Sequence, residues 1–322
     1  MKHAFIFPGQ GSQSVGMLSD LASHHTIVQD TFAEASDVLG YDLWELAQQG
    51  PKETLDQTDK TQPALLASSV AIWRVWKRLG KTLPAMMAGH SFGEYSALVC
   101  AEALDFRDAV SLAQDRGRFM QTAVPEGEGA MAAILGLDDE TVENVCQQAA
   151  QGHVVSAVNF NAPGQVVVAG HKAAVERAVV EAKNAGAKKS IVLPVSVPAH
   201  SSLMKPAADK MAERLATVTF HPPKVPVLHN ADCCAQHTQA EEIREALVKQ
   251  LYYPVNWVKT IQTMANQGIT LFFEMGPGKV LTGLNKRIDK KIITYPTDSQ
   301  EILNQAAIQS AYVSTYMHSQ SQ

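Results

Sequence analysis

One pentapeptide in the sequence has the composition and context of a catalytic nucleophile. Gly89-His90-Ser91-Phe92-Gly93 matches the pattern G-x-S-x-G, with a short apolar run before it and a helical pattern over 94–103 after it. A strand–turn–helix context exposes the serine hydroxyl at a helix N-terminus, where backbone N–H groups and the helix dipole stabilise an oxyanion. The alternative is a glycine-rich turn with a capping serine, and the flanking strand and helix favour the nucleophile.

A serine nucleophile needs a base, and eleven histidines are available for that role. His200 is the best placed, because it follows the apolar run 191–197 and precedes a helix, at the carboxyl end of an expected strand. His90 adjoins the nucleophile, and we expect its side chain to point away from the reacting face. The residues alone leave the choice of base open.

A third candidate is an arginine on the apolar side of a helix. The pattern over 105–123 predicts a helix whose apolar stripe includes Arg116, whereas Arg118 lies on the polar face. A guanidinium on an apolar face is costly unless it meets an anion. That anion is either a buried carboxylate of the protein, in a structural ion pair, or the carboxylate of a substrate held by two hydrogen bonds.

Composition narrows the class of protein. The 322 residues are 46% hydrophobic and 18% charged, which predicts a globular protein with a substantial core. The net charge of -5 gives no overall positive field for nucleic acid, and no apolar run is long enough for a membrane span or a signal peptide. We therefore expect a cytoplasmic protein with no membrane or nucleic-acid partner. The cysteines lack metal-site spacing and are expected to be reduced; they are Cys100, Cys146, Cys233 and Cys234.

Strands and helices alternate along the first and last thirds of the chain. The expected strands lie over 4–7, 85–89 and 272–275, and the expected helices over 26–39 and 62–79, with another from Lys279. This order predicts a parallel sheet covered by helices. The chain end from Ser314 onward is rich in Ser and is expected to fray.

The middle of the chain has an order of its own. It reads as strand, helix, strand, strand, helix and strand, over 131–137, 138–150, 154–159, 166–169, 172–184 and 189–195. This βαββαβ order is the ferredoxin-like pattern. We therefore predict an α/β fold in which a large domain, formed by 1–126 and 198–322, is interrupted by a ferredoxin-like subdomain at 127–197.

Further short segments accompany the serine motif along the chain. In order, with that motif extended, they are Pro8-Gly9-Gln10-Gly11-Ser12-Gln13, Thr61-Gln62-Pro63-Ala64, Gly89-His90-Ser91-Phe92-Gly93-Glu94-Tyr95-Ser96-Ala97, Arg116-Gly117, Asn159-Phe160-Asn161-Ala162-Pro163-Gly164-Gln165, Val197-Pro198-Ala199-His200-Ser201 and Gly276-Pro277-Gly278. Together these seven segments resemble the malonyl-CoA:acyl-carrier-protein transacylases of bacterial fatty acid synthesis. The resemblance spans about residues 4 to 290.

The resemblance implies a hydrolase-like parallel-sheet domain with a ferredoxin-like insertion, and it implies roles for the matching residues. Ser91 resembles the family's nucleophile and His200 its base. Gln250 is similar to the glutamine whose main-chain carbonyl orients that histidine. The resulting dyad would use a backbone oxygen in place of the usual carboxylate.

Three further positions complete the implied site. Gln10 and the N–H of Phe92 resemble the oxyanion hole, and Arg116 resembles the clamp on the free carboxylate of malonate. Phe92 stands where the family most often has leucine, and Tyr253 stands where asparagine is common. The resemblance implies no metal and no cofactor.

The implied function is transfer of a malonyl group from malonyl-CoA to the phosphopantetheine thiol of acyl carrier protein, in a ping-pong cycle through a malonyl-serine. Three alternatives remain open: a discrete acyltransferase serving a polyketide synthase, a serine esterase or thioesterase, and a carrier-protein docking module with a silent site. We expect a monomer. Because acyl carrier protein is acidic, docking needs a local basic patch. A candidate is a basic cluster on an expected helix, formed by Lys286, Arg287, Lys290 and Lys291. The alternative is that this cluster is only a solvated helix face.

Overall fold

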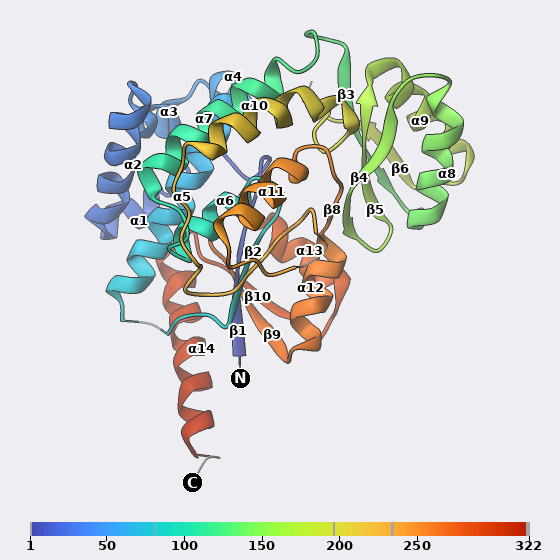
Figure 1. Cartoon of the computed structure of the whole chain (residues 1–322). Coiled ribbons are helices and arrows are strands. Elements are labelled where there is room, and N and C mark those ends of the chain that lie inside the picture. Colours follow the sequence, from blue (N-terminus) through green and yellow to red (C-terminus); the bar gives the residue numbers. More distant parts are fainter. Residues whose placement is uncertain (1, 81, 196, 233–234, 320–322) are drawn as a thin grey trace.

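A parallel sheet forms the centre of the larger part of the molecule. The computed structural model describes residues 2–80, 82–195, 197–232 and 235–319 (Figure 1). The first sheet has the order β10-β9-β1-β2-β7, and every pair of neighbours in it is parallel. Its strands are β1 (Lys2–Phe7), β2 (Met86–Gly89), β7 (Val227–Leu228), β9 (Ile269–Glu274) and β10 (Ile293–Pro296). The predicted α/β fold with a parallel sheet is thus confirmed.

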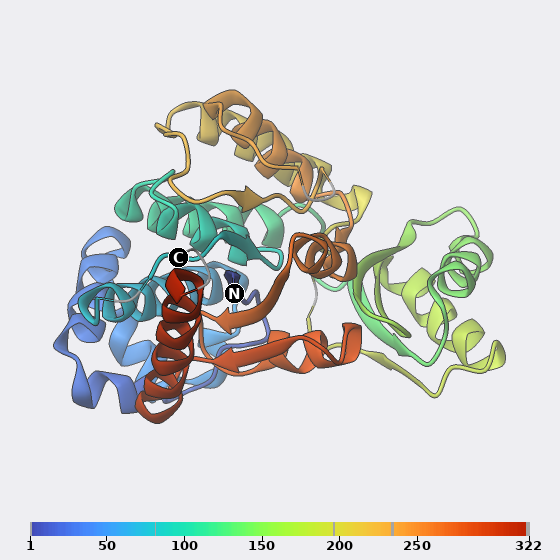
Figure 2. The ribbon, with the colours of Figure 1, turned by 90° about the horizontal axis from the view of Figure 1, so that it is seen from below.

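Helices bury both faces of this sheet, as parallel strands require. On one face, Phe5 and Phe7 of β1 pack in a core with side chains of α2 (Thr26–Leu39), α5 (Thr58–Arg78), α6 (Gly93–Cys100), α7 (Phe106–Gln121), α10 (Lys205–Ala216) and α11 (Ala240–Gln250). On the other face, Ala4 and Ile6 pack against α12 (Trp257–Asn266) and α13 (Val280–Ile288). Figure 2 shows the central strands between these helical layers. The smaller helices on the first side are α1 (Ser19–His24), α3 (Leu43–Gln49) and α4 (Lys52–Leu55).

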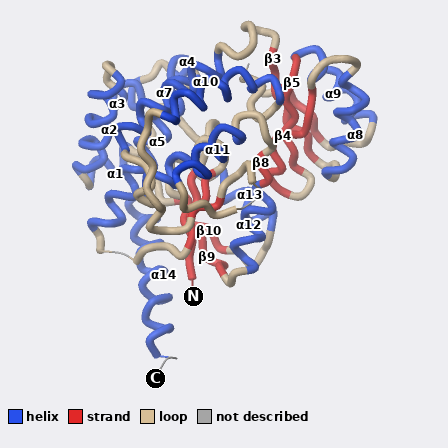
Figure 3. Tube along the Cα trace, in the orientation of Figure 1, coloured by secondary structure: helices blue, strands red, loops and turns tan. Residues whose placement is uncertain are grey.

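A second sheet lies to one side of the first (Figure 3). Its order is β6-β3-β5-β4-β8, and all its pairs are antiparallel except β4 with β8. Its strands are β3 (Gly129–Leu135), β4 (Val155–Ala162), β5 (Gln165–His171), β6 (Lys189–Val192) and β8 (Val255–Asn256). Two helices, α8 (Asp139–Ala150) and α9 (Lys172–Asn184), cover one face with a separate apolar core. Residues 129–192 therefore follow the order β3-α8-β4-β5-α9-β6.

Several boundaries differ from the sequence prediction, and two of the differences have a clear physical reason. The strand predicted over 189–195 ends at Val192, because Pro194 has no N–H to continue the ladder. The frayed end predicted from Ser314 is wrong, since α14 (Gln300–Ser319) continues through it. No glycine or proline interrupts that helix, and its first turns bury Leu303. Residues 320–322 lie outside the described part.

Two other expectations concern thiols and membranes. Cys100 and Cys146 are free and buried, whereas the expectation for Cys233 and Cys234 lies outside the described residues. Across the ranges that the structure describes, we find no helix with the length and apolarity needed to cross a bilayer.

The turn around Ser91 packs directly on the central sheet. A Cβ atom on Gly93 would lie 2.1 Å from the carbonyl oxygen of Phe7, and one on Gly89 would lie 1.8 Å from the carbonyl carbon of Gly93. Both separations are far below van der Waals contact. The two glycines of G-x-S-x-G are therefore required because β2, α6 and β1 approach one another closely here.

We expect Gly93→Ala to lower the free energy of unfolding by on the order of 4 kcal/mol, or to prevent folding, because rigid backbone blocks the added methyl group. The matched control is Gly283→Ala in α13, where a Cβ would meet nothing within 4 Å. That control should be neutral or stabilising by up to about 1 kcal/mol. Denaturant titration measures both, and equal stability of the two variants would contradict the packing argument.

Candidate active site

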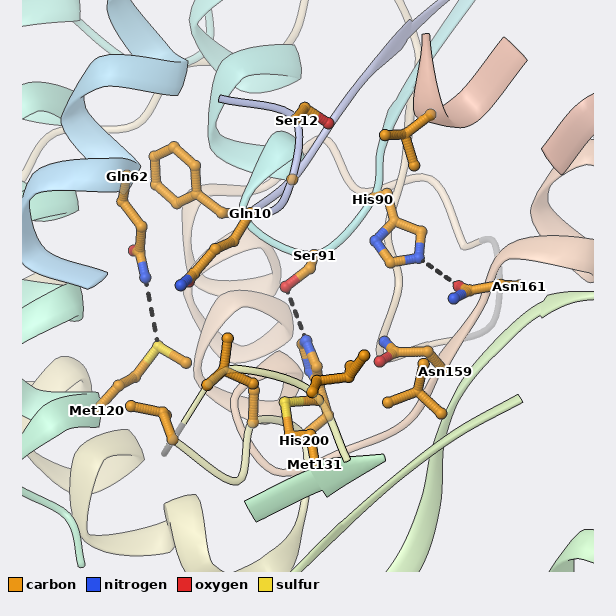
Figure 4. Close-up of a pocket in the computed structure, with 18 of the residues that line it drawn as sticks. Gln10, Ser12, Gln62, His90, Ser91, Met120, Met131, Asn159, Asn161 and His200 are labelled. Atoms are coloured by element: carbon orange, nitrogen blue, oxygen red, sulfur yellow. Dashed lines mark hydrogen bonds between the residues drawn. The ribbon is translucent and has the colours of Figure 1, made fainter. Parts of the chain in front are cut away.

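Ser91 sits on a strained turn between β2 and α6. Its φ is +51°, in the left-handed region that residues other than glycine seldom occupy. The side chain of Asn230 holds this conformation, since its Oδ1 accepts from the Ser91 N–H at 2.9 Å and its Nδ2 donates to the Gly89 carbonyl at 2.9 Å. Ser91 Oγ lies 2.7 Å from His200 Nε2 (Figure 4).

His200 is buried and held in one tautomer. Its Nδ1 lies 2.7 Å from the main-chain carbonyl oxygen of Gln250, and a carbonyl oxygen can only accept. Nδ1 therefore carries the proton, and Nε2 presents its lone pair to the Ser91 hydroxyl. Burial, together with the nearby charge of Arg116, lowers the pKa of His200 to about 3. The imidazole is thus neutral at neutral pH.

The position of His200 corrects the sequence argument. His200 lies in a loop eight residues after the end of β6, not directly at the end of a strand, because β6 stops at Val192. Its φ of +64° is another left-handed value, and its N–H donates to the carbonyl of Leu251 at 3.0 Å. The last residue of α11, Gln250, thus holds the ring of His200, and the next residue, Leu251, holds its backbone.

Arg116 is buried beside this pair, with 1% of its surface exposed. Its Nη2 donates to Gln250 Oε1 at 2.9 Å, its Nη1 lies 3.2 Å from Met120 Sδ, and its Nε has no partner. No carboxylate of the described residues forms an ion pair with it. The alternative of a structural ion pair is therefore wrong for this part of the chain. Burial lowers the pKa of the guanidinium, as expected for a cation out of water.

A cavity of about 240 Å³ joins these groups. Gln10, Ser91, Phe92, Arg116 and His200 all line it, and Gln250 lies behind Arg116 and His200. Gln10 is exposed and lies near Ser91 (Figure 4), and its Nε2 is 3.4 Å from Thr58 Oγ1. The N–H of Phe92 has no acceptor among the described residues. Apolar side chains form much of the remaining wall, among them Met120, Met131, Val167, Leu193, Val197, Leu281 and Leu284.

Some functional positions were not found from the sequence. His90 was expected to point away, but it lines the cavity, and its Nε2 lies 2.7 Å from Asn161 Oδ1 (Figure 4). The bond to Asn161, a contact between residues 71 positions apart, could not be read from the sequence around His90. Asn230 gave no signal, being a single amide in a loop 139 residues from its partner. Glu94, which follows the serine motif, is buried and contacts His229 and Gln250, a role that its position in the motif does not indicate.

Metal binding finds no support in the part of the chain described: no three His, Cys, Asp or Glu side chains are grouped to hold an ion. A serine on a strand-to-helix turn, beside a neutral histidine and above a parallel sheet, is the arrangement of α/β enzymes with a serine nucleophile.

Comparison with known proteins narrows this class. The family model described as "acyl transferase domain" matches residues 4–304. The malonyl CoA-acyl carrier protein transacylase of Escherichia coli K12 is 63% identical over 285 residues, which cover 88% of this chain and 92% of that protein. The protein of the same name from Bacillus subtilis is 44% identical and covers 95% of this chain and 96% of its own length.

Solved structures of similar proteins point to the same family. An acyl carrier protein S-malonyltransferase from Vibrio cholerae superposes with a TM-score of 0.92 at 57% identity, covering 95% of this chain and 99% of that one. A malonyl-transacylase solved in complex with a type II PKS acyl-carrier protein superposes with a TM-score of 0.95 at 55% identity. The match covers 96% of this chain and 100% of that one. The chain therefore belongs to the family of malonyl CoA-acyl carrier protein transacylases, as its seven segments indicated. It is an acyltransferase.

We expect His200 to stay neutral in the folded protein from about pH 8 to about pH 5, because burial holds its pKa near 3. Imidazole nitrogen shifts in NMR spectra, assigned with a His200→Ala variant, measure this directly. The sign follows from the ordinary value of 6.5: the unfolded chain takes up the proton first, so the contribution of neutral His200 to stability is lost as pH falls from 6.5 toward 3. A titration midpoint near 6.5 in the folded protein would contradict the assignment.

Proposed function

We propose that this chain transfers a malonyl group from malonyl-CoA to the phosphopantetheine thiol of acyl carrier protein, through a malonyl ester of Ser91. The observation that carries the proposal is the buried guanidinium of Arg116, which shares a cavity with Ser91 and His200 and pairs with no carboxylate of the described chain. A malonyl group brings the missing carboxylate, and an acetyl group does not. Relatives that are 63% and 44% identical carry the corresponding name.

The first half-reaction acylates the serine. His200 Nε2, 2.7 Å from Ser91 Oγ, takes its proton as the oxygen attacks the thioester carbonyl. The oxyanion of the tetrahedral intermediate accepts from the N–H of Phe92 and the amide of Gln10. The C–S bond then breaks, and coenzyme A leaves with the proton from His200.

The second half-reaction repeats these steps in reverse. The pantetheine thiol gives its proton to His200 and attacks the malonyl-serine carbonyl, and Ser91 recovers its proton when the C–O bond breaks. The main-chain carbonyl of Gln250 holds the Nδ1–H at 2.7 Å and stabilises the imidazolium during both transfers. A backbone dipole thus takes the place that a carboxylate holds in many serine enzymes.

We also propose the domain division: a hydrolase-like domain from 1–126 and 198–322, with a ferredoxin-like subdomain inserted at 127–197. Its support is the element order of the inserted segment and the separate core beneath α8 and α9. The short strand β8 is the exception, because it comes from the later segment and pairs with β4. The cavity receives residues from both parts, among them Ser91 from one and Met131, Asn159 and Val167 from the other.

Docking of the carrier protein is proposed at the end of α13. Lys286 and Arg287 are exposed on its last turn, whereas Leu281 and Leu284 of the same helix line the cavity. Lys290 and Lys291 are also exposed, but they follow the helix rather than belong to it, because it ends at Ile288. A basic helix end beside the cavity suits an acidic carrier whose arm must reach Ser91.

A carrier from polyketide synthesis is a second candidate. The neighbour with a TM-score of 0.95 was solved with a type II PKS acyl-carrier protein. The site chemistry is the same for either carrier, so the two candidates differ only in the docking surface.

Mixing the protein with malonyl-CoA should produce a malonyl-sized mass adduct that is absent in Ser91→Ala. Acetyl-CoA should label the wild type far less. Arg116→Ala should reduce the malonyl preference by about 100-fold, because the substrate carboxylate then has no cation to meet. Intact-protein mass spectrometry measures each adduct.

The outcomes separate the alternatives. Rapid release of malonate without a carrier indicates a hydrolase, and an absence of both adduct and turnover indicates a docking module with a silent site. A malonyl adduct on Ser91→Ala would exclude that residue as the nucleophile.

Reversing two charges on α13, in Lys286→Glu with Arg287→Glu, should raise the KM for acyl carrier protein by about tenfold and leave the KM for malonyl-CoA unchanged. The control is Lys183→Glu on α9, an exposed lysine on a helix that does not line the cavity. Steady-state transfer assays measure both constants. An unchanged KM for the carrier would rule out docking at this helix end.

A further inference from the structure

Glu94 is a buried carboxylate that the proposed reaction leaves unused. It lies in the first turn of α6, three residues after Ser91, and is fully buried. Its Oε1 is 2.6 Å from His229 Nδ1, and its Oε2 accepts from the N–H of Asn230 at 3.0 Å and from Gln250 Nε2 at 2.8 Å. Glu94 does not line the cavity, so any effect on the substrate must pass through these neighbours.

The bond from Gln250 Nε2 to Glu94 helps to determine which way that amide faces. Gln250 Nε2 lies among three acceptors: Glu94 Oε2 at 2.8 Å, the Ser91 carbonyl at 2.9 Å and Asn230 Oδ1 at 3.4 Å. The main-chain carbonyl of Ser91 can only accept, and Glu94 Oε2 accepts beside it, so the nitrogen must be on this side. Gln250 Oε1 then faces Arg116 Nη2 at 2.9 Å. A flipped amide would set NH₂ against the guanidinium and oxygen against the carboxylate.

This orientation keeps the charge of Arg116 available. The guanidinium meets only neutral acceptors of the described residues, Gln250 Oε1 and Met120 Sδ, while Glu94 stays one side chain away, behind the amide. A carboxylate in direct contact would pair with Arg116 and compete with a substrate carboxylate. Burial lowers the pKa of Arg116, and the charge of Glu94 acts in the opposite direction.

The same contacts reach the nucleophile and the base. Asn230, whose N–H is held by Glu94, accepts from the Ser91 N–H. The side-chain amide of Gln250 donates to Glu94, and the main-chain carbonyl of Gln250 accepts from His200 Nδ1. One carboxylate therefore supports the two residues on which the turn at Ser91 and the tautomer of His200 depend.

We infer that Glu94 is a positioning residue for acyl-donor selection: by fixing the amide of Gln250, it presents a neutral oxygen to Arg116 and leaves the guanidinium free for the carboxylate of the acyl group. The inference rests on the proposed malonyl transfer. It assigns Glu94 no contact with substrate.

The test compares acylation of Ser91 by malonyl-CoA and by acetyl-CoA, each as kcat/KM, because a residue that only supports the fold would lower both alike. Glu94→Met keeps the length of the side chain and removes its acceptors. We expect the malonyl preference to fall by about tenfold, with a smaller change for acetyl-CoA. In a Gln250→Met background, Glu94→Met should leave the preference unchanged, since the amide through which it acts is gone.

A second pair of substitutions does not depend on that variant folding. Glu94→Gln combined with Gln250→Glu exchanges the amide and the carboxylate at equal length and equal net charge. The carboxylate then meets Arg116 directly, and the malonyl preference should fall by about 100-fold while acetyl transfer to Ser91 persists. Thermal melting checks that each variant is folded.

The results distinguish a failure of the proposed malonyl transfer from a failure of the role of Glu94. A wild type without malonyl preference overturns the proposed function and this inference together. If the wild type prefers malonyl-CoA, two results overturn the role of Glu94 alone. One is an exchanged pair, Glu94→Gln with Gln250→Glu, that keeps the preference. The other is an equal loss of kcat/KM for both donors in Glu94→Met. Additive effects of Glu94→Met and Gln250→Met would also overturn it.

Discussion

The hydrogen bond from His200 Nδ1 to the main-chain carbonyl of Gln250, 2.7 Å long, is the interaction on which the site depends. It sets the tautomer of the base without bringing a negative charge to the cavity. A carboxylate in that place would lie close to Arg116 and would neutralise it. The guanidinium beside the serine can therefore stay unpaired because the group behind the histidine is a neutral backbone oxygen. An enzyme that recognises an anionic acyl group cannot keep a competing anion next to its cation.

The fold supplies this arrangement from elements that are distant in sequence. The central sheet fixes Ser91, because β1 and β2 leave no room for a side chain at Gly89 or Gly93. Helix α7 delivers Arg116 from its buried side, and the end of α11 delivers Gln250. Arg116, His200 and Gln250 are buried and Ser91 is partly buried, which limits the water that would screen the guanidinium and solvate the imidazole.

The sequence predicted what local patterns determine. Helices over 26–39 and 172–184 were predicted with the bounds that the structure has, because apolar periodicity and polar ends define them. Ser91 was found from a motif, and Arg116 from its place on an apolar stripe. The missed features depend on contacts across the chain. His90 lines the cavity and contacts Asn161, β6 stops where proline removes a donor, and Asn230 meets Ser91 only in the folded chain.

The strand β8 ties the two walls of the cavity together. It begins five residues after Gln250 and pairs with β4 at Asn159 and Phe160, so a hydrogen-bonded ladder connects the support of the base to the second sheet. A movement of that sheet away from the serine would pull on the chain that carries Gln250 and would disturb the histidine. The position of the second sheet and the orientation of the catalytic base are therefore coupled through this short ladder.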